Sequence, residues 1–176
     1  MDEQERARLR AAIEATEGGA PDPAAADALM RRMLTESRTI AVVGASPRPD
    51  RPSHGVLRTL VAAGWQILPI NPMPEALRDG VAGLPCFPTL SAAAASLPAG
   101  ERIDLVDVFR RSEECEEIAR EAVAIGARGL WLQLGVISPA AAQIANEASM
   151  LFVQDRCPAI EMPRLGISGP NTRASA

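Results

Sequence analysis

Short apolar runs alternate with amphipathic segments along most of this chain, and this alternation restricts its fold more than any other feature. The runs have the composition of β-strands and cover residues 39–43, 65–70, 103–109, 128–134 and 151–154. Strands that are separated by helices of 10–15 residues indicate βαβ units and a parallel sheet. Several runs are apolar at nearly every position, which is typical of strands covered by helices on both faces. The sequence therefore predicts an α/β fold, a three-layer sandwich around a mainly parallel five-stranded sheet.

The helices between these strands carry start and stop signals. We expect Ser53 to cap a helix that Gly64 ends, and Ser112 to cap a helix that ends before Gly126. Ser138 is followed by a proline at the first helical position and opens another helix. A short helix is expected at residues 91–95.

Two helical segments, residues 2–16 and 23–36, precede the first strand, and Asp22 is the expected N-cap of the second. We interpret residues 1–37 as an N-terminal helical extension that packs on the domain; a pair of partner-binding helices is the alternative. The predicted α/β domain covers residues 38–165. Residues 166–176 are rich in Gly, Asn and Ser and are predicted to form a flexible tail.

Composition argues against several classes of function. The formal net charge is −4 and no basic face is visible, so we expect no nucleic-acid partner. No apolar run reaches the roughly 18 residues of a membrane span, and the charged N-terminus does not resemble a signal peptide. The three cysteines are far apart, which favours a reduced, cytoplasmic protein. All 18 basic residues are Arg and His54 is the single His, so neither a metal site nor a catalytic triad is expected.

The loop after the first strand carries the clearest ligand signal, because ligands of open parallel sheets bind beyond the carboxyl ends of the strands. Gly44 allows a sharp turn and a close approach of the backbone. A helix starting at Ser53 presents free N–H groups that favour an anion, and Arg51 offers a guanidinium to a phosphate. A strand-to-helix turn without a ligand is the alternative. The G-x-G-x-x-G fingerprint of dinucleotide-binding proteins is missing.

The end of the second strand argues against NAD. A Rossmann dehydrogenase places an acid there for the ribose, whereas this chain has Asn71 and Pro72, with Glu75 as the nearest acid. Arg110, beyond the third strand, adds positive charge to the same edge. A neutral strand end beside an arginine fits an adenosine that carries an extra phosphate, as in NADP or coenzyme A.

From Thr39 to about Leu165 the chain resembles the small stand-alone coenzyme A-binding proteins, whose Rossmann-like domain is similar to that of the succinyl-coenzyme A ligase alpha subunit. The order and spacing of several short motifs carry this resemblance: residues 41–46, 51–53, 68–72, Gly83, 104–110, 131–135 and 155–158.

The resemblance implies that Gly44, Ala45, Ser46 and Arg51, with Ser53 at the helix start, hold phosphates. It also implies that Asn71 and Pro72 contact the adenosine end, and that Phe109 and Arg110 form the rim near the pyrophosphate and the pantetheine arm. The ligase's phosphorylated-histidine domain has no counterpart here, so we do not expect ligase activity from this chain alone.

The function expected from these observations is binding of coenzyme A or an acyl-coenzyme A without catalytic residues, with a homo-oligomer left open. One alternative is an NAD(P)- or flavin-linked enzyme or redox sensor. The other is a subunit of an enzyme that acts on coenzyme A thioesters. Asp107 is interpreted as a residue that orients a loop, and Trp131 as a core residue.

Cys157 follows the last strand, beside Arg156, and two interpretations of it remain open. An adjacent guanidinium and a local helix N-terminus would lower the pKa of its thiol, and a mixed disulfide with coenzyme A would then form under oxidation. The alternative is a small buried packing residue.

Overall fold

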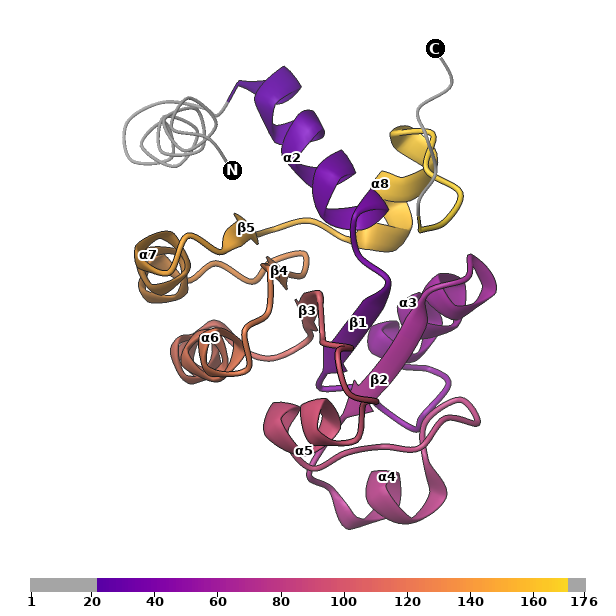
Figure 1. The fold of residues 1–176 in the computed structure, drawn as a ribbon. Coiled ribbons are helices and arrows are strands. Elements are labelled where there is room, and N and C mark those ends of the chain that lie inside the picture. The colour runs from indigo at the N-terminus through magenta and orange to yellow at the C-terminus, as the bar shows by residue number, and fades with distance from the viewer. Residues whose placement is uncertain (1–21, 171–176) are drawn as a thin grey trace.

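A computed structural model describes residues 22–170 and contains one five-stranded sheet in which every pair of neighbouring strands is parallel (Figure 1). The order of the strands is β2-β1-β3-β4-β5. Their bounds are β1 Thr39–Val43, β2 Gln66–Ile70, β3 Leu105–Val108, β4 Gly129–Leu132 and β5 Leu151–Val153. The predicted fold class, a Rossmann-like three-layer sandwich, is confirmed.

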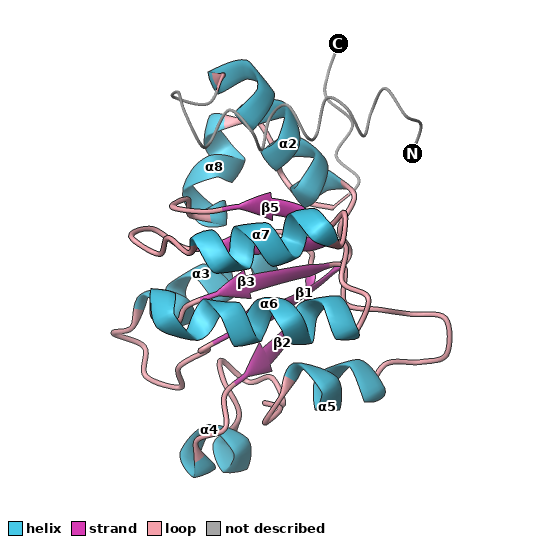
Figure 2. Ribbon diagram, turned by 90° about the vertical axis from the view of Figure 1, so that its left-hand side faces the viewer, coloured by secondary structure: helices cyan, strands magenta, loops and turns pink. Residues whose placement is uncertain are grey.

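Helices cover both faces of the sheet (Figures 1 and 2). The helices α5, α6 and α7 lie on one face, and α2, α3 and α8 lie on the other. The bounds of the helices are α2 Pro23–Thr35, α3 Pro52–Ala62, α4 Pro74–Asp79, α5 Leu90–Ala95, η1 Ser112–Glu114, α6 Cys115–Ala124, α7 Pro139–Glu147 and α8 Pro158–Arg164, where η1 is a 3₁₀ turn. Parallel strands that are buried on both faces need apolar side chains on both, and every residue of β1 is buried.

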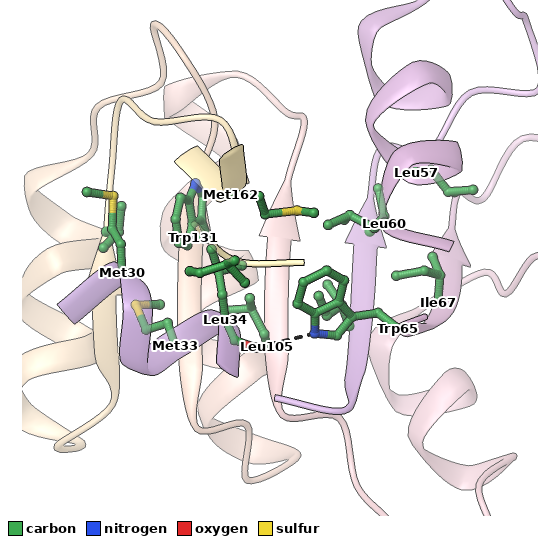
Figure 3. Packing of buried hydrophobic residues seen from close by; sticks show 14 of the residues in the cluster. Met30, Met33, Leu34, Leu57, Leu60, Trp65, Ile67, Leu105, Trp131 and Met162 are labelled. Atoms are coloured by element: carbon green, nitrogen blue, oxygen red, sulfur yellow. Dashed lines mark hydrogen bonds between the residues drawn. The ribbon is translucent and has the colours of Figure 1, made fainter. Parts of the chain in front are cut away.

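Two hydrophobic clusters result, one on each face of the sheet. The cluster under α2, α3 and α8 contains both tryptophans (Figure 3). Trp131 is fully buried, and its indole N–H donates to the carbonyl of Arg156 at 2.8 Å, so the prediction of a core residue is confirmed. The indole N–H of Trp65 donates to the carbonyls of Leu34 and Ser37, which fixes the end of α2 to the sheet.

Helix α2 is part of this core. The side chain of Asp22 accepts from the N–H of Ala24 at 3.1 Å, as expected of an N-cap, and the helix buries Met30, Met33 and Leu34. On the surface, Arg164 of α8 pairs with both Asp27 of α2 and the buried Glu161. The helix predicted at residues 2–16 lies outside the described residues.

Two of the predicted helix caps are wrong. Ser53 is the second residue of α3, whose N-cap Arg51 makes no side-chain cap bond. The hydroxyl of Ser53 instead accepts from the N–H of Ser46 at 3.1 Å. Ser112 lies inside η1, and its hydroxyl accepts from the N–H of Ile137 at 3.2 Å. In both cases the serine binds a neighbouring loop rather than the first turn of its own helix. Ser138 is an N-cap as predicted, because it accepts from Ala141.

The helices α4 and α8 are not expected from the sequence. After α8 ends, residues 166–170 pack back on the domain: Ile167 is buried and donates its N–H to the carbonyl of Met162 at 2.8 Å. The rest of the segment predicted as a tail, residues 171–176, lies outside the described part. None of the helices of residues 22–170 has the length and apolar character needed to cross a membrane.

Candidate functional site

The strand order places a topological switch point between the ends of β1 and β3. The chain leaves β1 toward β2 on one side, and it later returns past β1 to form β3 on the other side. The loops that follow these two strands therefore diverge, and such a switch point is where open α/β sheets bind ligands. In this structure the switch point lies between the loop from Gly44 to Arg51 and the segment Phe109–Arg110.

Gly44 and Phe109 meet at this point. Gly44 has a φ of +83°, which favours glycine, and a Cβ built on it would lie 2.5 Å from the carbonyl oxygen of Phe109 and 2.9 Å from Cδ of Arg110. The N–H of Phe109 donates to the carbonyl of Val43 at 2.8 Å, which continues the β1–β3 ladder to this contact. The nearest atom across the contact is a backbone oxygen, and only glycine fits at position 44.

The loop after β1 is fixed by its own side chains. The N–H of Arg48 donates to the hydroxyl of Ser46 at 3.2 Å, and the hydroxyl of Ser53 holds the N–H of Ser46. Nδ1 of His54 lies 3.0 Å from the carbonyl oxygen of Ser46. Because a carbonyl oxygen only accepts, Nδ1 is the donor in this bond. His54 therefore stabilises the loop, and it is nearly buried.

The N–H groups of this loop are already engaged. Those of Gly44 and Ala45 donate to the carbonyl of Ile70, at 2.9 and 3.2 Å, and that of Ser46 donates to Ser53. Gly44, Ala45 and Ser46 therefore have no backbone donor left for a phosphate, so donors must come from other groups at this edge. The hydroxyl hydrogen of Ser46 is one such donor.

Arginines supply the charge at the switch point. The side chain of Arg51 is exposed, and none of residues 22–170 forms an ion pair or hydrogen bond with its guanidinium. Arg110 is exposed too, but its Nη2 lies 2.7 Å from Oε1 of Glu114. Arg48 pairs with Asp50 at 3.2 Å. Of these three arginines, Arg51 is the one that forms no ion pair with another described residue.

Asn71 connects β2 to the loop after β1. Its amide Nδ2 donates to the carbonyl of Ala45 at 2.8 Å, and its Oδ1 accepts from the N–H of Met73 at 3.0 Å. The side chain is buried, so its polar atoms serve the protein itself. Pro72 and Met73 are exposed beside it. All the site residues predicted from the sequence follow β1, β2 or β3, and the shared sheet edge brings them together.

A buried polar pair that the sequence did not indicate lies one strand further along. Asp107 of β3 is fully buried, and its Oδ1 accepts from Nε2 of Gln133 at 2.7 Å. Its Oδ2 has no hydrogen-bond partner in the described part of the chain. Burial raises the pKa of this carboxyl to about 7, against an ordinary 3.8, and the bond from Gln133 opposes that rise. Asp107 orients the residue that begins the β4–α7 loop, which agrees with its interpretation.

Cys157 is a buried residue at the start of α8. Desolvation raises the pKa of its thiol, although the N–H groups of Ile160 and Ala159 act in the opposite direction, and Asp107 and Glu161 add to the rise. The expectation that Arg156 lowers this pKa is wrong, because the guanidinium turns toward the Asp155 carbonyl and Glu161 and the thiol has little contact with solvent. The structure favours the packing interpretation.

A shallow hollow lies at the opposite, amino edge of the sheet. Arg32 and Arg128 on its rim both pair with Glu36, at 3.3 and 2.7 Å. These charges connect α2 to the start of β4 and are compensated within the protein. Among residues 22–170 no cluster of His, Cys, Asp and Glu has the composition of a metal site.

Comparisons with known proteins give one matching family model and several similar proteins. Residues 38–163 match the family model described as a CoA binding domain. The uncharacterized protein YneT of Bacillus subtilis is 36% identical over 129 residues, which cover 73% of this chain and 87% of that protein. A solved protein of Thermus thermophilus is 33% identical with a TM-score of 0.69 and covers 79% of this chain and 98% of its own. A hypothetical protein of Pyrococcus horikoshii is 32% identical with a TM-score of 0.68 and covers 79% and 91%.

Proposed function

Because this chain belongs to the CoA binding domain family, we propose that it binds coenzyme A at the switch point between β1 and β3. The contact between Gly44 and the Phe109 carbonyl is the observation that carries this proposal. At this contact the two loops expose backbone, and the exposed Arg51, which forms no ion pair within residues 22–170, lies in the loop after β1. A polyanionic ligand with a flexible arm fits such a place, because backbone allows close approach and a guanidinium binds phosphate oxygens in pairs.

The phosphates of coenzyme A are assigned to side chains rather than to loop N–H groups. In this proposal Arg51 binds a phosphate and Ser46 donates its hydroxyl hydrogen to a phosphate oxygen. Arg110 adds positive charge from the segment after β3. Gly44 and Ala45 contribute shape alone, because their N–H groups donate to Ile70. Ser53 and Phe109 position the two loops.

The adenosine end is assigned to the end of β2. Asn71 fixes this segment through its two hydrogen bonds, and the exposed Pro72 and Met73 offer an apolar surface to the base. The role of Asn71 is therefore positioning rather than contact. No acid precedes Glu75 after this strand, which leaves room for a phosphorylated ribose.

We propose that the residues at the switch point bind coenzyme A and do not catalyse a reaction on it. His54, the single histidine, holds the Ser46 carbonyl and is nearly buried. Asp107 is buried below the edge and bound to Gln133. Neither side chain is paired with a nucleophile, so the site resembles a holder of the ligand rather than a reaction centre.

Thermal unfolding in the presence of coenzyme A tests the proposed function. A ligand at 100 times its Kd that binds only the folded state adds about 2.7 kcal/mol to the free energy of unfolding. For a chain of this size the expected rise in Tm is on the order of 5 °C. A Tm that rises with NADH and not with coenzyme A would contradict the proposal.

A further inference from the structure

We infer that the protein binds acyl-coenzyme A in preference to free coenzyme A, with the acyl group lying on the exposed apolar side chains of Leu134, Ile137 and Ile160 beyond β4 and β5. This inference deepens the proposed function and depends on it. The three side chains are called the acyl platform below. They are 56%, 52% and 53% exposed, and all three follow the carboxyl ends of β4 and β5.

The loop that carries two of these side chains is held firmly. The N–H of Gly135 donates to the carboxylate of Asp155 at 2.8 Å, and that of Ile137 donates to Ser112 at 3.2 Å. The N–H of Ser138 donates to the side chain of Gln154 at 3.1 Å. Neighbouring loops after β3 and β5 therefore fix the backbone while the apolar side chains stay in solvent.

The residue that accepts from Gly135 has a strained backbone. Asp155, which caps Gly135, has a φ of +55°, a conformation that L side chains rarely adopt. Such strain persists only where surrounding contacts enforce it. A rigid loop loses little conformational entropy when a ligand binds to it.

The order of apolar and charged residues along the sheet edge matches the order of apolar and charged parts along an acyl-coenzyme A. The apolar Pro72 and Met73 follow β2 at one end, Arg51 and Arg110 flank β1 and β3 in the middle, and the acyl platform follows β4 and β5. The ligand has a flat base at one end, phosphates in the middle and an apolar acyl chain at the other end. Neighbouring strands are about 4.8 Å apart, so β5 lies about 10 Å beyond β3, a distance that an extended pantetheine arm spans.

The charged neighbour of the platform is already satisfied. Arg156 donates to the carbonyl of Asp155 at 2.9 Å, and its Nε lies 3.8 Å from Glu161. The acyl platform beyond β4 and β5 therefore presents apolar surface to a ligand. An aliphatic acyl chain is the part of the ligand that gains from covering it, because each buried methylene group is worth about fourfold in affinity.

Calorimetric titration with free coenzyme A and with octanoyl-coenzyme A tests the inference. For the unmodified protein we expect octanoyl-coenzyme A to bind at least about tenfold more tightly. In the double variant Leu134→Ser, Ile137→Ser the ratio of the two dissociation constants should fall toward one. Val61→Ser is the control, because Val61 is 40% exposed at the far end of α3 and should leave the ratio unchanged.

Equal affinity for the two ligands in the unmodified protein would overturn the inference while leaving the proposed function intact. A double variant that weakens both ligands equally would overturn it too. If sedimentation shows that the unmodified protein self-associates and the double variant does not, with no preference for octanoyl-coenzyme A, the platform is an interface between two copies instead. If the unmodified protein binds neither ligand, the proposed function itself has failed.

Discussion

The α-carbon of Gly44 lies so close to the carbonyl of Phe109 that a methyl group on it would be 2.5 Å from the carbonyl oxygen. This contact joins the loops after β1 and β3, which leave the sheet in opposite directions. The local geometry of the proposed site thus depends on the missing side chain of Gly44. It also depends on the backbone carbonyl of residue 109, which no substitution of Phe109 removes.

Replacing Gly44 by alanine should damage both the fold and the site. Its φ of +83° and the contact with Phe109 together predict a loss of at least about 2 kcal/mol in the free energy of unfolding. Denaturant unfolding measures this loss, and coenzyme A binding should disappear. Gly55→Ala is the matched control, because a Cβ there meets nothing within 4 Å and alanine is favoured in a helix by up to about 1 kcal/mol. Equal stability of the two variants would show that the contact carries no constraint.

Replacing Arg51 by alanine should weaken coenzyme A binding without altering the fold. Loss of a charge-assisted contact to phosphate costs about 1.5–3 kcal/mol, or roughly tenfold to hundredfold in Kd. Arg58→Ala is the control, because Arg58 is an exposed arginine further along α3. Calorimetric Kd values for both variants, with unchanged Tm in the absence of ligand, check the prediction. An unchanged Kd for Arg51→Ala would assign the phosphates to Arg110 or to the serine hydroxyls.

Asp107 should make stability depend on pH between about 4 and 7. The folded protein keeps the proton of this carboxyl up to a pKa of about 7, whereas the unfolded chain loses it near 3.8. The contribution of the neutral acid to stability is therefore fully present below pH 3.8 and is lost as the pH rises to about 7. The whole change is about 4 kcal/mol at most.

Asp107→Asn separates this effect from the titration of other carboxyls. The variant keeps an oxygen that accepts from Gln133 but carries no titratable proton. Urea unfolding at several pH values should give a difference in stability between variant and parent that grows in favour of the variant from pH 4 to pH 7. A constant difference over this range would mean that Asp107 has an ordinary pKa.

The three cysteines should react with iodoacetamide in the order of their exposure. Cys86 is partly exposed, whereas Cys115 and Cys157 are buried, and burial with the acidic neighbours Glu114 and Glu113 raises the pKa of Cys115 to about 11. Alkylation of the folded protein, followed by mass mapping, should modify Cys86 first. Cys157 should also form no mixed disulfide with coenzyme A disulfide. An adduct at Cys157 under native conditions would restore the reactive-thiol hypothesis.

The strands and the ligand edge could be predicted because each depends on local patterns. Apolar runs gave the five strands, and the positions after them gave the loops that the sheet then brings together. The cap at Ser53 was predicted wrongly because a serine near a helix start serves equally well as a hydrogen-bond partner for a different loop. Helix α8 was missed because it is short and contains Pro163.

Contacts between distant residues could not be read from the sequence. The pair Asp107–Gln133 joins residues 26 positions apart, and the register of β3 against β4 decides that they meet. The engagement of the Gly44 and Ala45 N–H groups by Ile70 has the same origin, because β2 ends beside β1. For this reason the residues that follow each strand could be named from the sequence, whereas the partners that engage their polar groups needed the structure.

Isothermal titration of the unmodified protein with coenzyme A, in parallel with NADPH and NADH, tests the central claim most directly. The account predicts saturable binding of coenzyme A with one site per chain, weakened in Arg51→Ala, and no saturable heat with either nicotinamide nucleotide. Saturable binding of NADPH or NADH, together with no binding of coenzyme A at millimolar concentration, would contradict it.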